Sequence, residues 1–280
     1  MMRSAVLLLL AAAFLPSAAP SSAAPSSAAA LDGLPIHYTA NGSGPTVLFV
    51  HGWTCDESSW SEQVPALQTR YRVVTLDLPG HGQTGSPVGE KLTMDLFARA
   101  VESVRADLQA DRIVLVGHSM GTPVIVQYAR LFPSHVAALV FVDGVLSVGA
   151  AAGHPPDGRS MQGPAGLKNR EANTRGMFSA ATTPALQARI LKMMLSAPES
   201  TAIEAMQAMY DAAIWKNDVL PMPVLGIYAD HSRMANRALL QRHYPHFALT
   251  EIPGTGHFLM LEKPAAFNRI LLAFLAKQKF

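Results

Sequence analysis

The residues best suited to chemistry in this 280-residue sequence form a Gly-His-Ser-Met-Gly motif at positions 117–121. β-Branched apolar residues precede the motif and an apolar pattern with helical spacing follows it, so residues 113–126 are expected to form a strand, a sharp turn and a helix. A serine at the tip of such a turn projects its hydroxyl clear of the sheet, and the flanking glycines allow close backbone packing. We therefore predict that Ser119 is a nucleophile.

Three further Gly-containing turns follow apolar runs elsewhere in the chain. They are Val-His-Gly-Trp at 50–53, Asp-Leu-Pro-Gly-His-Gly at 77–82 and Gly-Thr-Gly-His-Phe at 254–258. With the serine motif, and in this order, they resemble the α/β-hydrolase family from about residue 34 to the C-terminus. The resemblance implies an α/β fold, in which a mostly parallel central sheet has helices on both faces and carries an inserted helical lid.

The resemblance also implies roles for residues in these turns. His257 is expected to be the base, because it follows both the serine and the acid in the family order. The backbone N–H groups of Trp53 and Met120 are expected to form the oxyanion hole, which stabilises charge on the carbonyl oxygen in the transition state. The substrate-binding wall is assigned to three residues beside these groups, with His51 also holding the oxyanion loop: His51, Gly52 and His118.

The acid that orients the histidine has two candidates. Asp143 follows the apolar run at 136–142, and Asp230 follows the next one at 223–229. Most family members place the acid a few residues after the later strand, where Ser232 stands in this chain. We prefer Asp143, because other members use that position, and we keep Asp230 as the alternative.

Apolar runs and helical patterns alternate along the chain, which predicts a parallel sheet with the active site at the carboxyl ends of its strands. Strands are expected at residues 34–40, 46–50, 72–76, 113–118, 136–142, 223–229 and 247–252. Helices are expected at residues 57–69, 92–108, 233–243 and 263–276.

Residues 146–220 form a connection far longer than the usual 2–6 residues between α/β elements. We therefore interpret them as a helical lid inserted into the core. The core then consists of residues 31–145 and 221–280. The first part of the insert, 149–166, is rich in Gly, Pro and Ala and is expected to be irregular. Its second part, 184–215, has a helical pattern dense in methionine, which suits an adaptable pocket lining but also ordinary packing. These methionines are Met193, Met194, Met206 and Met209.

Residues 1–30 have the pattern of an export signal, with Arg3 followed by an apolar segment at 5–15 and a stretch rich in Ala, Ser and Pro. The apolar segment is shorter than the about 20 residues that span a bilayer. Cleavage is expected after residues 28–30, Ala-Ala-Ala, giving a periplasmic or secreted chain without a stable membrane span. An uncleaved anchor or a disordered leader is the alternative.

The composition excludes several classes of partner. The formal net charge is +2 and the basic residues form no stripe, so nucleic acid is not an expected partner. Cys55 is the one cysteine in the sequence, which rules out an intramolecular disulfide. We expect its side chain to be buried and to act as a small packing residue. We find no metal-ligand spacing, phosphate-binding loop or dinucleotide fingerprint, so neither a metal nor a cofactor is predicted. The sequence leaves the oligomeric state open.

A serine at the nucleophile position separates this chain from epoxide hydrolases and haloalkane dehalogenases, which have aspartate there. The expected function is therefore hydrolysis of small to medium, largely apolar carboxylic esters through an acyl-enzyme intermediate. Two related alternatives use the same serine, namely a C–C bond hydrolase and a cofactor-free haloperoxidase. An alternative of another class is a ligand-binding module on the same fold that has no catalytic activity.

Overall fold

The computed structural model describes residues 26–144, 158–232, 234 and 237–280. Within these residues, eight strands form a single sheet in the order β1-β2-β4-β3-β5-β6-β7-β8. β1 and β2 are antiparallel to their neighbours, whereas the strands from β4 onwards in this order are parallel. The strands are β1 Ser26–Leu31, β2 Leu34–Asn41, β3 Thr46–Val50, β4 Arg72–Leu76, β5 Ile113–His118, β6 Val136–Val142, β7 Val224–Ala229 and β8 Phe247–Ile252.

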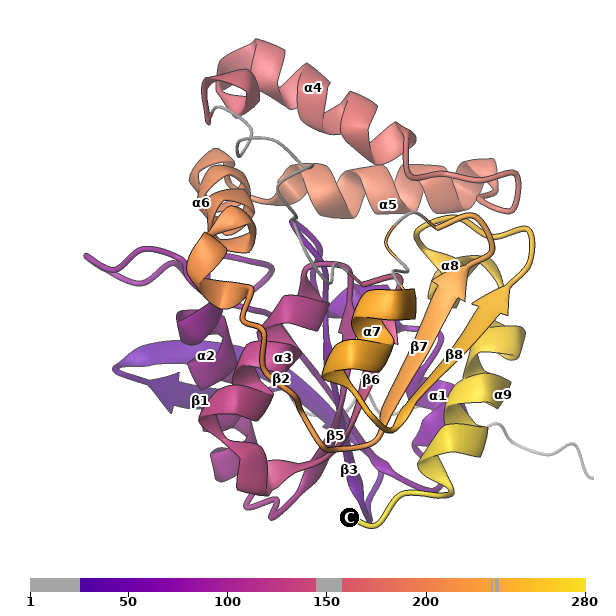
Figure 1. Ribbon diagram of the computed structural model, residues 1–280. Coiled ribbons are helices and arrows are strands. Elements are labelled where there is room, and N and C mark those ends of the chain that lie inside the picture. The colour runs from indigo at the N-terminus through magenta and orange to yellow at the C-terminus, as the bar shows by residue number, and fades with distance from the viewer. Residues whose placement is uncertain (1–25, 145–157, 233, 235–236) are drawn as a thin grey trace, which may run out of the picture.

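Helices cover both faces of this sheet, which explains why the central strands are apolar on both sides (Figure 1). One face carries α2, α3 and α7, and the other carries α1 and α9. Thr93 caps the N-terminus of α2 by accepting a hydrogen bond from Leu96 N–H. The helices of the core are α1 Val64–Leu67, α2 Met94–Asp107, α3 Gly121–Leu131, α7 Arg237–His243, α8 Leu259–Glu262 and α9 Pro264–Leu275.

One expected helix and one stretch expected to be irregular differ from the structure. The helix expected at residues 57–69 is broken into a 3-10 turn, η1 Glu57–Trp60, and the short helix α1, because Pro65 lacks the N–H needed inside a continuous helix. The prediction that residues 149–166 are irregular is wrong from residue 158 onwards, where the chain is helical. Residues 149–157 lie outside the described residues. Pro164 occupies the first turn of α4, where proline favours helix initiation.

The insert between β6 and β7 is helical where the structure describes it. Figure 1 shows α4, α5 and α6 beyond the carboxyl ends of the parallel strands, over the side of the sheet where the site is expected. Helices α5 and α6 agree with the helical pattern predicted for residues 184–215. The elements of the insert are η4 Gly158–Met161, α4 Gly163–Arg175, α5 Pro184–Ser196, α6 Glu199–Tyr210 and η5 Ala212–Ile214.

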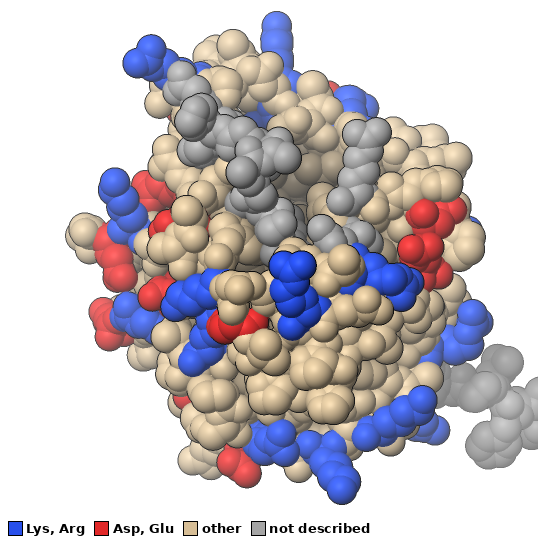
Figure 2. Space-filling model, viewed as in Figure 1, with Lys and Arg blue, Asp and Glu red and all other residues tan. Residues whose placement is uncertain are grey.

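Strand β1 overlaps the predicted export leader. It pairs with β2 over its whole length, from Ser26 opposite Thr39 to Leu31 opposite Leu34. The rest of the leader, residues 1–25, lies outside the described residues, and export stays a prediction. None of the helices in the described residues is long and apolar enough to cross a membrane. Figure 2 shows acidic and basic side chains both present on the visible face.

Candidate active site

Ser119 lies at the turn between β5 and α3, in a left-handed backbone conformation with φ of +51°. This conformation is strained for a residue with a side chain, and strain of this kind is concentrated at functional sites. The turn is held by Ser119 N–H, which donates to Val142 O at 3.0 Å. A Cβ on Gly121 would lie 2.4 Å from Val50 O, so only glycine allows α3 to approach β3 this closely.

His257, in the loop after β8, is hydrogen-bonded to Asp143 at the end of β6. The distance from His257 Nδ1 to Asp143 Oδ2 is 2.7 Å, and both side chains are buried. Ala229 N–H also donates to the carboxylate, at 3.3 Å. Burial raises the pKa of the Asp143 carboxyl, but the hydrogen bond and charge of His257 outweigh this effect and leave the pKa below its ordinary value. The carboxylate therefore stays charged and holds the proton of the ring on Nδ1.

The structure does not bring Asp230, the alternative acid, to His257. Asp230 Oδ2 instead accepts a hydrogen bond from Gly254 N–H at 3.0 Å. That hydrogen bond lowers the pKa of the Asp230 carboxyl, which lies beside the exposed His231. Asp230 thus braces the outer side of the loop that carries His257, while Asp143 contacts the ring itself.

His118 joins the nucleophile turn to the same loop. The distance from His118 Nε2 to His257 O is 2.9 Å, and the two ring centroids are 4.6 Å apart. Because a carbonyl only accepts, the proton of His118 is on Nε2. Burial and the neighbouring His257 lower the pKa of His118 to about 3, so the ring stays neutral near pH 7. His118 is thereby suited to positioning the backbone of His257 and not to acting as the base.

The two N–H groups predicted for the oxyanion hole have no backbone or side-chain acceptor within the described part of the chain. They belong to Trp53, after β3, and to Met120, directly after the nucleophile. Gly52 keeps the first of these loops close to the second, because a Cβ on Gly52 would lie 3.1 Å from Ser119 Cβ. Unpaired N–H groups held on either side of a serine are the arrangement that stabilises an oxyanion.

His51 lies behind the site and not in its wall. It is fully buried, its Nδ1 donates to Gly52 O at 2.8 Å, and its Nε2 accepts from Leu78 N–H at 3.1 Å. The side chain therefore has no ring nitrogen left for a substrate. The expectation that His51 holds the oxyanion loop fits these contacts, whereas its assignment to the substrate-binding wall does not.

A small cavity of about 10 Å³ lies beside Ser119, between the core and the insert. The core contributes both remaining predicted wall residues, Gly52 and His118, and the insert contributes two methionines. Of the four methionines singled out in the sequence, only Met194 lines this cavity. Met193 packs elsewhere, since its sulfur lies 3.4 Å from Ser59 Oγ. The lining consists of Gly52, Trp53, Cys55, His118, Ser119, Met177, Met194, His257 and Phe258.

Cys55 is a buried member of this lining and is unsuited to nucleophilic attack. Burial raises the pKa of its thiol to about 12, so the reactive thiolate is scarce at neutral pH. The prediction of a buried filler agrees with this position.

Two hydrogen bonds tie the insert to the site, and sequence reasoning missed both. His257 N–H donates to Met177 O at 3.2 Å, and the indole Nε1 of Trp53 donates to Ala202 O at 2.8 Å. The oxyanion loop and the base loop are thus each bonded to backbone of the insert. A backbone carbonyl can belong to any residue type, so no sequence signal marks either acceptor.

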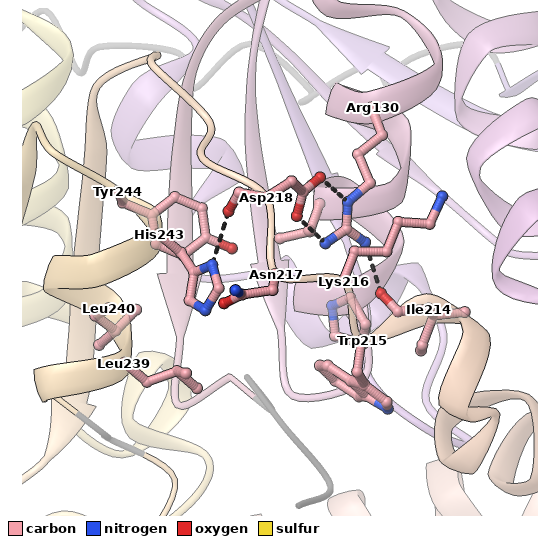
Figure 3. A pocket seen from close by; sticks show the side chains of 12 residues that line it. Arg130, Ile214, Trp215, Lys216, Asn217, Asp218, Leu239, Leu240, His243 and Tyr244 are labelled. Atoms are coloured by element: carbon pink, nitrogen blue, oxygen red, sulfur yellow. Dashed lines mark hydrogen bonds and ion pairs between the residues drawn. The ribbon is translucent and has the colours of Figure 1, made fainter.

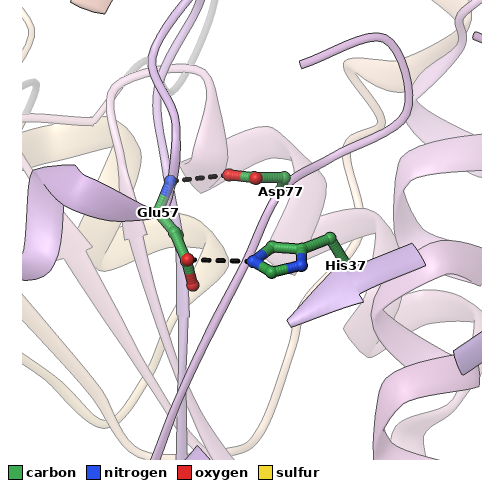
Figure 4. Close-up of side chains that lie close together, drawn as sticks. All are labelled: His37, Glu57 and Asp77. Carbon is green, nitrogen blue, oxygen red and sulfur yellow. Dashed lines mark hydrogen bonds and ion pairs between the residues drawn. The ribbon is translucent and has the colours of Figure 1, made fainter. Parts of the chain in front are cut away.

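One cluster has the donor set of a metal site, namely His37, Glu57 and Asp77 (Figure 4). Its donors are already bonded within the chain. Glu57 accepts from His37 Nε2 at 2.9 Å and from Thr75 Oγ1 at 2.8 Å. Asp77 accepts the backbone N–H groups of Glu57 and Gln83, each at 2.8 Å. These contacts favour a role in fixing the loops after β3 and β4.

Comparisons with known proteins show the family of this chain. A sequence profile of the alpha/beta hydrolase family matches residues 47–270, and the chain belongs to that family. The chain is 29% identical over 245 residues to the dihydrolipoyllysine-residue acetyltransferase component of the acetoin cleaving system from Pseudomonas putida; the match covers 84% of this chain but only 64% of that relative.

Two solved structures show the same fold. One is a thermophilic esterase from Thermogutta terrifontis, with a TM-score of 0.78, 22% identity and coverage of 90% of this chain and 98% of that one. The other is a bromoperoxidase from Bacillus anthracis, with a TM-score of 0.78, 23% identity and coverage of 90% and 100%. Family membership supports a hydrolase, while the neighbours differ in activity.

Proposed function

We propose that this protein is a serine hydrolase that cleaves carboxylic esters through an acyl-enzyme intermediate. The observation that carries the proposal is the buried hydrogen bond of 2.7 Å between His257 Nδ1 and Asp143 Oδ2. His257 and the strained Ser119 line the same cavity. A base oriented by a carboxylate and facing a serine is the arrangement that activates a hydroxyl for attack.

The mechanism assigns one task to each group. His257 Nε2 takes the proton of Ser119 Oγ as the hydroxyl attacks the ester carbonyl, and it later gives this proton to the leaving alkoxide. Asp143 stabilises the imidazolium without accepting its proton. The N–H groups of Trp53 and Met120 receive the negative charge that develops on the carbonyl oxygen, each contributing about 3 kcal/mol. Water then hydrolyses the acyl-enzyme by the same route.

The lining of the cavity supports apolar substrates. Met177 and Met194 of the insert line it together with the core residues Trp53 and Phe258. Thioether and aromatic groups pack against aliphatic or aromatic esters and offer few partners to charged ones. We therefore propose small to medium, largely apolar esters as substrates.

Hydrolysis of p-nitrophenyl esters from acetate to octanoate tests the proposal. Wild type should turn over the shorter esters, and Ser119→Ala should reduce kcat by at least about 10⁴ while keeping its circular dichroism spectrum. Ser58→Ala is a matched control, because Ser58 lies outside the cavity lining. Equal turnover by wild type and Ser119→Ala contradicts the nucleophile, and no turnover by wild type favours the ligand-binding module.

We also propose that the protein acts outside the cytoplasm. The support is the charged, apolar and small-residue pattern of residues 1–30. Fractionation of expressing cells and N-terminal sequencing of the recovered protein test this proposal. Retention of the full chain in the cytoplasm contradicts it.

A further inference from the structure

A second cavity, larger than the one beside Ser119, lies on the face that carries α7. Its volume is about 200 Å³, and it shares none of its lining residues with the cavity at the nucleophile. It is lined by one side of α3, by α7, and by the connection that returns from the insert to β7 (Figure 3). Pockets for drug-sized ligands measure about 300–1,000 Å³, so this one suits a smaller molecule.

Apolar groups make up about half of the wall of this cavity. Leu240 is fully buried, and Val126 and Tyr244 are each 7% exposed. The half-buried indole of Trp215 forms another side, with its Nε1 donating to Met209 O at 3.1 Å. An apolar ligand body, and a flat ring above all, would be in contact with these groups on several sides.

The polar groups of the cavity are of two kinds. Arg130 and Asp218 neutralise one another through a two-pronged ion pair, with distances of 2.7 Å for Nε–Oδ2 and 2.8 Å for Nη2–Oδ1. His243 Nδ1 donates to Asp218 O at 2.7 Å, which fixes its ring. These bonds make a rigid frame between α3, the connection and α7.

Two donors in the cavity are not used by this frame. The Lys216 ammonium and the Asn217 amide are exposed, and neither has a hydrogen-bond or ion-pair partner among the described residues. Figure 3 shows Asn217 and His243 in the middle, Arg130 and Lys216 on one side and the two leucines of α7 on the other. Since Arg130 and Asp218 cancel, Lys216 leaves the cavity with a surplus positive charge.

We propose that this cavity is a second ligand site, which binds a small organic carboxylate with an apolar body. The carboxylate pairs with the exposed Lys216 ammonium, and the body packs against Trp215 and Leu240. Figure 2 shows several basic side chains and fewer acidic ones across the middle of the face on which α7 lies, and this excess favours the approach of an anion. The site is independent of the proposed ester hydrolysis.

Calorimetric titration of the full-length protein with benzoate tests the proposal, with benzamide as the uncharged ligand of the same shape. Benzoate has nine non-hydrogen atoms. At an ordinary binding free energy per atom, we expect it to bind with a dissociation constant of about 1–10 mM. Benzamide should bind at least about tenfold more weakly. Benzoate should also quench tryptophan fluorescence, and Trp215→Phe should remove this signal while the calorimetric binding stays. Equal affinity for the two ligands, or no binding of benzoate at about 50 mM, which is about five times the weakest dissociation constant expected, overturns the proposal.

Variants decide whether the binding is at this cavity. Lys216→Gln should weaken benzoate about fivefold, the scale of one exposed charge pair, while Lys168→Gln on the exposed surface of α4 should leave it unchanged. Leu239→Trp should fill the space and abolish binding. Benzoate affinity that is the same in Lys216→Gln as in wild type places the ligand elsewhere and overturns the assignment. Lys216 is exposed, so this variant folds even where Leu239→Trp fails to.

Discussion

Two neighbouring parallel strands, β6 and β7, each end in an aspartate, and the two carboxylates have different surroundings. Asp143 is buried and bonded to the ring of His257 at 2.7 Å. Asp230, one strand further on, is bonded to the backbone of Gly254 at 3.0 Å. Both therefore act on the loop between β8 and α8, but one orients the side chain of the candidate base and the other supports its backbone from outside.

The difference comes from the position of each strand in the sheet and not from the local sequence. β6 is hydrogen-bonded to β5, which carries Ser119, whereas β7 separates β6 from β8. A carboxylate at the end of β6 is thus next to the nucleophile strand, and the loop after β8 must reach across β7 to meet it. Asp143 also has φ of +39°, a strained conformation of the kind found at functional sites.

Among the variants that test this comparison of the two aspartates, Asp143→Asn is predicted to have the largest effect. An amide in place of the carboxylate allows His257 to adopt the wrong tautomer, a defect that costs about 10⁴ in kcat in serine proteases. We expect kcat on p-nitrophenyl acetate to fall by about 10³–10⁴. The measurement is made at about pH 7.5, where Asp143 is charged in wild type. A loss below about tenfold in a folded variant would contradict the assignment of Asp143.

His118→Phe is predicted to have the next largest effect, because it removes the hydrogen bond to His257 O and keeps an aromatic ring. A shift of the base by about 1 Å costs up to about 10² in rate, so we expect kcat to fall about 10- to 100-fold, with KM changed less than about threefold. His118→Gln places an amide N–H near the position of Nε2 and should restore part of the loss. If both variants lose activity only through KM, His118 contacts substrate and is not a positioning residue.

Asp230→Asn is predicted to reduce kcat less than about tenfold, about 1.4 kcal/mol. The amide oxygen can still accept the hydrogen bond from Gly254 N–H, so the loop keeps its support. Steady-state kinetics beside Asp143→Asn give the ranking directly. The reverse ranking would move the catalytic role from Asp143 to Asp230.

The smallest predicted effect is on stability in acid. The folded-state pKa of Asp143 lies below its ordinary value of 3.8, so its charged form stabilises the fold above that pH, and this contribution is lost as the pH falls through the lower folded-state pKa. The urea midpoint of wild type relative to Asp143→Asn should therefore fall as the pH is lowered from about 5 to about 2, a range that extends further below the ordinary pKa than above it. A difference in midpoint that is independent of pH contradicts the shift.

The sequence predicted most of the core of this fold. β4 and β6 begin and end where the apolar runs at 72–76 and 136–142 do, because strands buried on both faces leave an unbroken apolar signal. β1 was missed, since its Ser and Ala side chains are weak strand formers and continue the composition of the leader. The break between η1 and α1 was missed because the helical spacing of Trp60, Val64 and Leu67 was read past Pro65.

Some residues of the candidate site could be predicted from the sequence and others could not. Glycine spacing indicated the turn at Ser119, since the close approach of Gly121 to Val50 O leaves no room for a side chain. The preference for Asp143 over Asp230 came from the family resemblance and left Asp230 open, because the decision depends on which strand end faces a loop far along the chain. The exclusion of His51 from the wall depends on contacts of both ring nitrogens with backbone, which leave no pattern in the sequence.

Strand β1 has a consequence for processing and solubility. Its six residues cover the outer edge of β2, whose own sequence includes Ile36 and Tyr38. Cleavage after Ala30 would remove all of β1 except Leu31 and uncover a row of unpaired backbone N–H and C=O groups, which is a template for aggregation. A signal peptidase that cuts before Ser26 would leave this protection in place. If the leader is cleaved, the position of the new N-terminus thus determines whether the chain has a covered or a self-associating sheet edge.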